Sequence, residues 1–403
     1  MSYLALTHHQ KVNIESSRIL NYLWRSFQIL LALFLFFLSI NLMSATFKNL
    51  GEDAAESVLA AASNPYIGLF IGLLITAIIQ SSSTSTTLIV AVVATGTLSL
   101  TDAVPMIMGA NIGTTLTSTI VALGFLSRKK EFRRAVSAGV IHDFYNILLA
   151  LVLLPLELSY GILSKIATVI GHQIAALELG VPNGFERLNS LSLSFIYELL
   201  IDLINNDVVA VIISFVLLFA SIKFLSFIIY RLLIGRSKER FNNYLFNRNL
   251  KSFSFGVFLT AGVQSSSITT SLIVPLVAKR KVSLNNAFPF IIGANLGTTL
   301  TALLAAMFKN EAAISIALIH LLFNLIGCLI FLISPLIRNL PLFLARSFGR
   351  TIMRYSVIGF SYIIVMFFLL PFTLIFINKE TVAQKLPTKH IENQVAMKIK
   401  EET

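Results

Sequence analysis

The feature that most constrains the fold of this chain is a string of eight polar residues inside apolar sequence. Residues 80–87 read Gln-Ser-Ser-Ser-Thr-Ser-Thr-Thr and lie between the apolar runs 71–79 and 88–93. A similar string, Gln-Ser-Ser-Ser-Ile-Thr-Thr-Ser, begins 184 positions later at residue 264. A buried hydroxyl without a hydrogen-bond partner costs about 2–7 kcal/mol. The repetition of this costly cluster therefore predicts that a ligand satisfies its hydroxyl groups.

The composition indicates that the setting of both clusters is a lipid bilayer. Of the 403 residues, 56% are hydrophobic and only 12% are charged, and the mean hydropathy is +0.82. Soluble domains carry about 25% charged residues, so we expect an all-α integral membrane protein. Apolar runs of about 20 residues, long enough to cross a bilayer, occur at 26–47, 136–157, 208–230, 313–337 and 356–377.

The basic residues are distributed as in a multi-pass membrane protein, and we expect it in the cell membrane (a plasma or inner membrane). The net charge is +12, but Lys and Arg form short clusters between apolar runs. This is the pattern of cytoplasmic loops under the positive-inside rule, and it argues against nucleic-acid binding. The same rule favours a cytoplasmic N-terminus. The single cysteine, Cys328, allows no intramolecular disulfide.

The chain is internally duplicated. Residues 80–117 match residues 264–301 at 23 of 38 positions without a gap, and Ile141-His-x-x-x-Asn146 matches Ile319-His-x-x-x-Asn324. The loop after the first cluster, 95–97, is uncharged, whereas its counterpart, 279–281, is Lys-Arg-Lys. Conversely, the basic loop 128–134 corresponds to a balanced loop around residue 309. We therefore expect two inverted-topology repeats, each with a re-entrant helical hairpin and broken helices that meet at the membrane midplane.

These patterns predict the organisation of the chain. The predicted segments are a cytoplasmic N-terminus (1–25), repeat 1 (26–157), an interfacial or external linker (158–207), repeat 2 (208–337), an interfacial segment with the last membrane helix (338–377), and a polar tail (378–403).

Three groups of residues carry a resemblance to a known family. They are the two Gln-Ser-Ser-Ser clusters, the two Gly-Ala-Asn-x-Gly-Thr-Thr blocks that begin at Gly109 and Gly293, and the run from Glu131 through His142-Asp-Phe-Tyr-Asn146 to Glu157. With these motifs the chain resembles the type II sodium-dependent phosphate cotransporters over most of residues 65–157 and 252–330. The resemblance implies a secondary active symporter that imports inorganic phosphate with Na⁺ by alternating access. It implies neither an enzyme nor a cofactor, and the sequence leaves the oligomeric state open.

The resemblance also implies roles for particular residues. The expected phosphate contacts are Ser81, Ser82, Ser83, Ser265, Ser266, Ser267, Asn111 and Asn295. The expected sodium ligands are Gln80, Gln264, Thr114, Thr115, Thr298, Thr299 and Asp143. The position of Asp143 is Leu321 in the second copy, so we expect Asp143 either to bind sodium or to pair with a nearby base. In the family an aspartate here accompanies net charge movement, which implies electrogenic uptake.

Physical chemistry explains why these residue types suit a phosphate–sodium symporter. Neither cluster contains Lys or Arg, yet an isolated ion in a low-dielectric medium costs tens of kcal/mol. Hydroxyl donors, free N–H groups at a broken helix and bound sodium ions could together offset this cost. Phosphate and sodium would then need each other in the site, which is the basis of coupling.

Other interpretations of the same residues remain open. Small hydroxyl residues in membrane helices mostly serve packing, Gly109-x-x-x-Gly113 is ordinarily a helix-contact motif, and Pro105 and Pro289 bend helices. His142, His320, Asn146 and Asn324 are expected to cross-link helices. An intramembrane serine hydrolase is disfavoured because the chain has no Gly-x-Ser-x-Gly elbow. A passive anion channel, or transport of sulfate or arsenate, remains an alternative.

Overall fold

The computed structural model describes residues 64–176, 194–234, 248–307, 310–355 and 357–377, together with Phe246 and parts of 20–46. The predicted N-terminal segment 1–25 lies almost wholly outside the described residues. The polar tail, residues 378–403, lies outside them completely. The first predicted crossing, 26–47, is described only in part, and there Phe36 packs with Ala91, Leu218 and Ala305.

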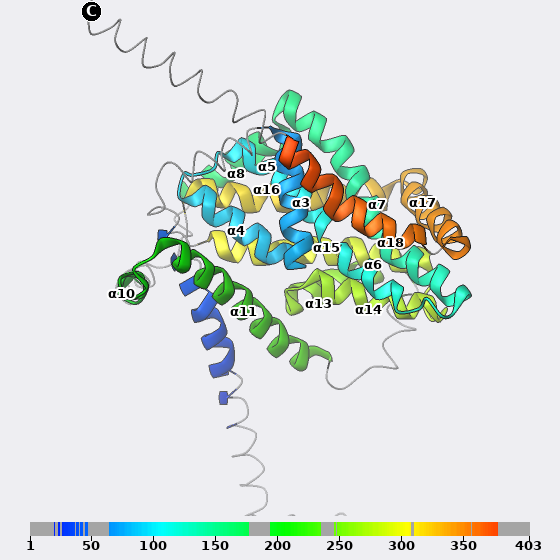
Figure 1. The fold of residues 1–403 in the computed structure, drawn as a ribbon, viewed down its shortest axis with the longest axis horizontal. Coiled ribbons are helices and arrows are strands. Elements are labelled where there is room, and N and C mark those ends of the chain that lie inside the picture. The colour runs from blue at the N-terminus through cyan, green and yellow to red at the C-terminus, as the bar shows by residue number, and fades with distance from the viewer. Residues whose placement is uncertain are drawn as a thin grey trace, which may run out of the picture.

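The described part of the chain is helical, as the sequence predicts, and contains no strand. Five stretches are long and apolar enough to cross a membrane: Leu100–Leu123, Lys129–Tyr160, Leu284–Ala306, Glu311–Ile333 and Val357–Ile377. Large apolar side chains such as Leu151 and Phe258 are exposed on the helix bundle, as expected of surfaces that face lipid. The chain is therefore a multi-pass membrane protein (Figure 1).

Each polar cluster lies where a helix is interrupted. Helix α3 (Pro65–Ile79) ends at Gln80, and α4 (Ser82–Ala94) begins after Ser81. In the second copy, α13 (Asn249–Val263) ends at Gln264, and α14 (Ser266–Ala278) begins after Ser265. The four helices have 15, 13, 15 and 13 residues, so none alone reaches the length of about 20 residues that a crossing needs. Figure 1 shows α3 and α4 leaving their break in different directions.

Glycines hold the first helix of each pair against the helix that follows it. Helix α5 (Leu100–Gly113) packs along α3, and α15 (Leu284–Ala306) packs along α13. A Cβ on Gly109 would overlap the Leu69 carbonyl oxygen, and a Cβ on Gly293 would overlap that of Phe253. Gly113 and Gly297 lie against Leu73 and Val257 in the same way. The Gly-x-x-x-Gly segments are therefore helix-contact motifs in both copies.

The two copies differ after this point. In the first, α5 is separated by Thr114 and Thr115 from the short helix α6 (Leu116–Leu123), whereas α15 runs without interruption through the equivalent residues. The long helix α7 (Lys129–Tyr160) packs on α6 and α14, and α16 (Glu311–Ile333) packs on α15 and α4. Helices of one copy thus contact the cluster of the other.

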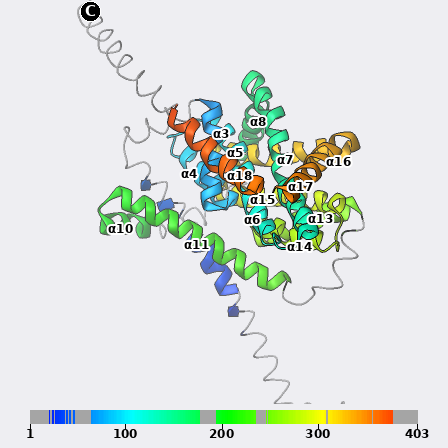
Figure 2. The same ribbon diagram turned by 45° about the vertical axis from the view of Figure 1, so that its right-hand side comes forward.

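The remaining helices surround this core. The predicted linker contains α8 (Ile162–Ala176), α10 (Ser194–Ile204) and the start of α11 (Asp207–Ile234). The carboxylate of Glu157 accepts hydrogen bonds from Leu163 N (2.6 Å) and Ser164 N (3.2 Å), which caps α8. Helix α17 (Pro335–Arg354) packs on α7, and α18 (Val357–Ile364) continues through a π-helical turn, Val365–Leu369. Figures 1 and 2 show α11 along one side of the bundle and α17 at its edge.

Candidate functional site

The two polar clusters meet at the centre of the helix core. The Ser83 hydroxyl donates a hydrogen bond to the Gln264 carbonyl oxygen at 3.2 Å, and the Ser267 hydroxyl donates one to the Gln80 carbonyl oxygen at the same distance. Ser83 and Ser267 are both buried. The third serine of each string therefore contacts the helix break of the other string. These two equivalent bonds join the two predicted phosphate-binding clusters.

Both glutamines occupy a strained backbone conformation. Gln80 has φ 57° and Gln264 has φ 52°, in the left-handed region that usually favours glycine at the end of a helix. Each backbone N–H still donates to a carbonyl of its helix, that of Thr76 or Thr260. Within the described part of the chain, neither carboxamide makes a hydrogen bond. Strain repeated at equivalent sites favours a functional use of the glutamine side chains.

The first two serines of each string lie at a helix N-terminus. Ser81 caps α4 by accepting a hydrogen bond from Thr84 N (3.3 Å), and Ser265 caps α14 by accepting one from Ile268 N (3.4 Å). Ser82 and Ser266 are the buried first residues of these helices. The positive ends of two helix dipoles thus point into the region where the clusters meet.

Hydroxyls of α6 and the preceding turn extend the site. Thr114 Oγ1 lies 3.3 Å from Ser267 Oγ, and Ser118 Oγ lies 2.8 Å from Thr270 Oγ1. The sequence analysis did not single out Ser118 or Thr270. The sequence feature that could have pointed to Thr270 is its position within the polar string 264–271.

Three of the predicted sodium ligands bond within their own segment. Thr115 donates to the Ile112 carbonyl oxygen (2.7 Å), Thr298 to that of Ala294 (3.0 Å), and Thr299 to that of Leu296 (2.7 Å). All three are buried. The structure thus places them beside the core without linking them to the serines.

The predicted residues Asn111 and Asn295 belong to a buried side-chain network. Asn295 contacts His142 Nε2 (2.9 Å), and its amide donates to Asn146 (2.9 Å) and Asn324 (2.7 Å). The Asn324 amide donates to Asn111 Oδ1 (3.1 Å), and that of Asn146 to the Asn111 carbonyl oxygen (2.7 Å). The network joins α5, α7, α15 and α16, so the expectation of helix cross-linking is confirmed for His142, Asn146 and Asn324.

His320 does not follow that expectation. It is fully buried, yet neither ring nitrogen has a hydrogen-bond partner among the described residues. The prediction that His320 cross-links helices is therefore wrong for the described part of the chain. The equivalence of His142 and His320 in sequence does not extend to their contacts. Asn111, the counterpart of Asn295, donates its amide to the Ile107 carbonyl oxygen of its own helix (2.9 Å) and accepts from Asn324 (3.1 Å) instead of bonding to His320.

Asp143 is a fully buried carboxylate without a basic partner among the described residues. Its Oδ2 accepts hydrogen bonds from Tyr362 (2.8 Å) and Thr119 (3.4 Å), while Oδ1 has no partner in the part of the chain that the structure describes. Two alternatives were predicted for Asp143, sodium binding and pairing with a base, and no such base is found among the described residues. The sequence analysis missed Tyr362, because it is 219 residues away and belongs to neither repeat.

At matching positions of the two copies, several buried hydroxyls have no hydrogen-bond partner among the residues that the structure describes. Thr76 and Thr260, Thr87 and Ser271, and Thr117 and Thr301 form three such pairs. Each unsatisfied buried group costs about 1–3 kcal/mol. These hydroxyls therefore repeat an unmet hydrogen-bonding capacity at equivalent positions of the two copies.

Comparison with known proteins identifies the family. The family model described as Na⁺/Pi-cotransporter matches residues 35–179 and 216–366. The chain is 30% identical to sodium-dependent phosphate transport protein 2A of Mus musculus, over 84% of this chain and 65% of that protein. It is 29% identical to protein 2B of Homo sapiens, over 86% and 64% respectively. It therefore spans slightly less than two thirds of these relatives, and no solved structure matches it. The extent of the family match, which includes both polar clusters and both Gly-Ala-Asn blocks, shows that this chain belongs to the Na⁺/Pi-cotransporter family.

Proposed function

We propose that this protein is a secondary active symporter that imports inorganic phosphate together with sodium ions. The observation that carries the proposal is the reciprocal pair of hydrogen bonds from Ser83 to Gln264 and from Ser267 to Gln80. These bonds join the backbones of the two glutamines to the hydroxyl clusters at the N-termini of α4 and α14. The relatives that match most of this chain are named sodium-dependent phosphate transport proteins.

We further propose that the two copies have inverted topology and that each helix pair around a cluster is a re-entrant hairpin. Two equivalent contacts support this proposal. The Ala94 carbonyl at the end of α4 accepts a hydrogen bond from Asn310 (2.8 Å), which precedes α16, and the Ala278 carbonyl at the end of α14 accepts one from Arg134 (2.7 Å) on α7. Each cluster helix thus ends beside the start of a long helix of the other copy, as a two-fold relation between the copies requires. The exchange of basic loops between the copies favours an axis in the membrane plane.

The uncharged nature of the cluster determines how it would bind phosphate. We assign hydrogen bonding of the phosphate oxygens to the hydroxyls and amides of Ser81, Ser82, Ser83 and their equivalents Ser265, Ser266 and Ser267. The dipoles of α4 and α14 add partial positive charge. Asn111 and Asn295 would fix the helices that surround the anion. The Asn295 amide donates to Asn146 and Asn324, and Asn111 Oδ1 accepts from Asn324.

Sodium would supply the remaining positive charge as cosubstrate. Carboxamide and hydroxyl oxygens are hard ligands suited to a hard cation, and we assign this role to Gln80, Gln264, Thr114, Thr115, Thr298 and Thr299. Asp143 would take a further sodium ion through its unpartnered Oδ1. A buried carboxylate is costly without a counter-charge, which favours sodium binding at Asp143. Because the carboxylate stays in the protein while this further ion is transported, its transport would make uptake electrogenic. Coupling then follows because each ion removes the electrostatic cost of binding the other.

Transport by alternating access would require the two copies to move against each other around the clusters. Among the described residues, four hydroxyl contacts join the copies, at 2.8–3.3 Å. Such contacts can exchange for bonds to a solute at little net cost. We place the protein in the cell membrane with its N-terminus in the cytoplasm, following the distribution of basic loops.

The test is radiolabelled phosphate flux into proteoliposomes, with an inward gradient of sodium or of choline. We expect uptake with sodium only, and a loss of about tenfold or more in the double variant Ser83→Ala/Ser267→Ala, which removes both hydroxyls that link the clusters. The matched control is Ser85→Ala/Thr269→Val, because these buried hydroxyls donate only to carbonyls of their own segment, at 3.1 Å each. Equal uptake in choline would refute sodium coupling, and wild-type flux in the first variant would refute the site.

A further inference from the structure

A pocket with five arginines lies away from the polar clusters, where three basic segments of the chain come together. Its volume is about 460 Å³, within the range of about 300–1,000 Å³ that is typical of small-ligand sites. Helix α7 contributes Arg133 and Arg134, the turn after α14 contributes Arg280, and α17 contributes Arg346 and Arg350. The rest of the lining is neutral: Ser137, Val277, Val282, Ser283 and Leu284.

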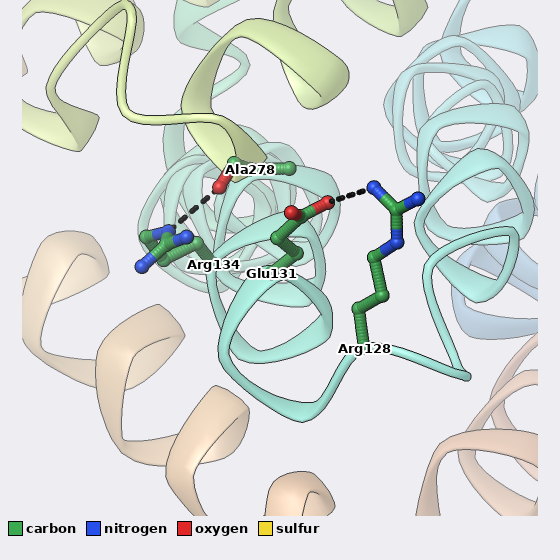
Figure 3. A network of polar contacts seen from close by, with 4 residues as sticks. All are labelled: Arg128, Glu131, Arg134 and Ala278. Atoms are coloured by element: carbon green, nitrogen blue, oxygen red, sulfur yellow. Dashed lines mark hydrogen bonds and ion pairs between the residues drawn. The ribbon is translucent and has the colours of Figure 1, made fainter.

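The positive charge of this pocket is not neutralised by the described part of the protein. None of the five arginines forms an ion pair with a described residue. The nearby acid Glu131 pairs instead with Arg128 at 3.4 Å. Figure 3 shows this pair on one side of α7, with Arg134 reaching the Ala278 carbonyl on the other. Five uncompensated guanidinium groups around one cavity repel one another, and a bound anion would remove that repulsion.

The packing of α17 on α7 fixes the pocket walls. A Cβ on Gly349 would overlap both Ser137 Oγ and the Arg133 carbonyl oxygen, so only glycine permits this approach. Arg346 is oriented by a hydrogen bond to Asn285 Oδ1 at 2.7 Å. The close approach holds together the two helices that carry four of the five arginines, and the hydrogen bond orients Arg346. Arg280, Arg346 and Arg350 are exposed and therefore accessible to an anion.

The position of α17 also gives the pocket access to the membrane surface. Helix α17 is amphipathic, with exposed apolar residues Leu336 and Phe343 on the helix that carries Arg346 and Arg350. Basic amphipathic helices lie in the interface between lipid headgroups and acyl chains. All three basic segments are those that the positive-inside rule assigns to the cytoplasmic side.

We infer that this five-arginine pocket is a second anion site, which binds a phosphate group at the cytoplasmic surface without sodium. Guanidinium groups match phosphate oxygens with paired, charge-assisted hydrogen bonds. The phosphate group could belong to an anionic lipid headgroup or be free inorganic phosphate, since the chemistry of recognition is the same. The site differs in principle from the polar clusters, because its positive charge comes from the protein instead of from a cotransported cation.

The first arm of the test measures binding of inorganic phosphate to the purified full chain in choline buffer. The variant is Arg346→Gln/Arg350→Gln. The matched control is Arg338→Gln/Arg354→Gln, which removes two charges from the same helix outside the pocket lining. If free phosphate is the ligand, the first variant should bind it about tenfold more weakly or worse, with the control unchanged.

The second arm counts phosphatidylglycerol molecules retained by the same proteins in native mass spectrometry, with phosphatidylcholine as the neutral comparison. If a headgroup is the ligand, the pocket variant should lose one retained phosphatidylglycerol that the control keeps. The single variant Arg280→Gln provides a second reading if the double variant is poorly folded. Loss in either arm supports the site and identifies the source of the phosphate group.

Wild-type behaviour of the pocket variants in both arms would overturn the inference, and the arginines would then serve membrane orientation alone. This outcome is separable from failure of the symport proposal. The pocket is tested without sodium, whereas symport is tested by sodium-driven flux and by Ser83 and Ser267.

Discussion

The hydroxyl of Ser83 donates a hydrogen bond to the backbone carbonyl of Gln264, 181 residues later in the chain, at 3.2 Å. The equivalent contact from Ser267 to Gln80 spans 187 residues at the same distance. Each serine therefore contacts the left-handed glutamine of the other copy, and the two helix breaks form one structure. The predictions below test which parts of that structure serve folding and which serve transport.

The glutamines at the breaks should be dispensable for stability. A left-handed backbone costs a non-glycine residue about 1–2 kcal/mol, so Gln80→Gly and Gln264→Gly should leave the thermal unfolding temperature unchanged or raise it. Removal of a carboxamide that binds sodium should nevertheless lower sodium-driven phosphate flux by about tenfold. Asn205→Gly relieves a left-handed residue outside the clusters (φ 46°) and should leave flux unchanged. A lower unfolding temperature with normal flux would assign the glutamines a structural role only.

The Gly-x-x-x-Gly contacts should be intolerant of any side chain. Gly109→Ala places a methyl group against the Leu69 backbone, which cannot move without separating α3 from α5. We expect a loss of about 3 kcal/mol or more in stability, or failure to fold. Gly359→Ala is the control, because its nearest neighbour is the end of the flexible Ile352 side chain at 3.3 Å. Thermal unfolding in detergent measures both, and equal stability of the two variants would contradict the contact.

Tyr362 should act on transport through Asp143. The Tyr362 hydroxyl donates to Asp143 Oδ2 at 2.8 Å, and a hydrogen bond to a charged group contributes about 1.5–3 kcal/mol. If the carboxylate binds sodium, Tyr362→Phe should change the sodium concentration for half-maximal flux by about tenfold while the protein still folds. The control is Tyr355→Phe, at an exposed tyrosine that lies shortly before Tyr362 in the chain, and it should leave the sodium concentration for half-maximal flux unchanged.

Asp143 itself should determine the charge moved per cycle. Asp143→Asn keeps the shape of the side chain and the acceptor for Tyr362 but removes the negative charge that we assign to a sodium ion. Current recordings from membranes that contain the variant should show a smaller charge per phosphate than those of the wild type. An unchanged ratio of charge to phosphate would remove Asp143 from the sodium path.

The amide network around Asn295 should be essential for stability. Asn295→Ala leaves polar groups of His142, Asn146 and Asn324 without this partner in the core, at about 1–3 kcal/mol each. We expect a large drop in the unfolding temperature. Ser334→Ala removes only a helix cap and should cost about 1 kcal/mol. A small effect at Asn295 would show that water replaces the lost hydrogen bonds.

The sequence predicts that the two polar strings belong together, but it does not predict how their residues bond. The doubled Gln-Ser-Ser-Ser strings predicted that the two clusters matter together, and the structure brings them into contact. The sequence did not distinguish Ser81 and Ser265, which cap helices, from Ser83 and Ser267, which bridge the copies. Residues of one string share a composition, and only the direction of each side chain in the packed core separates their contacts.

The sequence by itself determined the membrane setting, the helical class, the internal duplication and the polar strings, because hydropathy, charge and repetition are properties of short segments. Only the tertiary structure decided that Asn295 bonds to His142 while His320 has no partner among the described residues, that Tyr362 reaches Asp143, and that three basic segments surround one pocket. These are contacts between residues far apart in the chain. They depend on how closely the glycines let the helices approach and on which side chains that packing brings within hydrogen-bonding distance. A local pattern of residues contains neither kind of information.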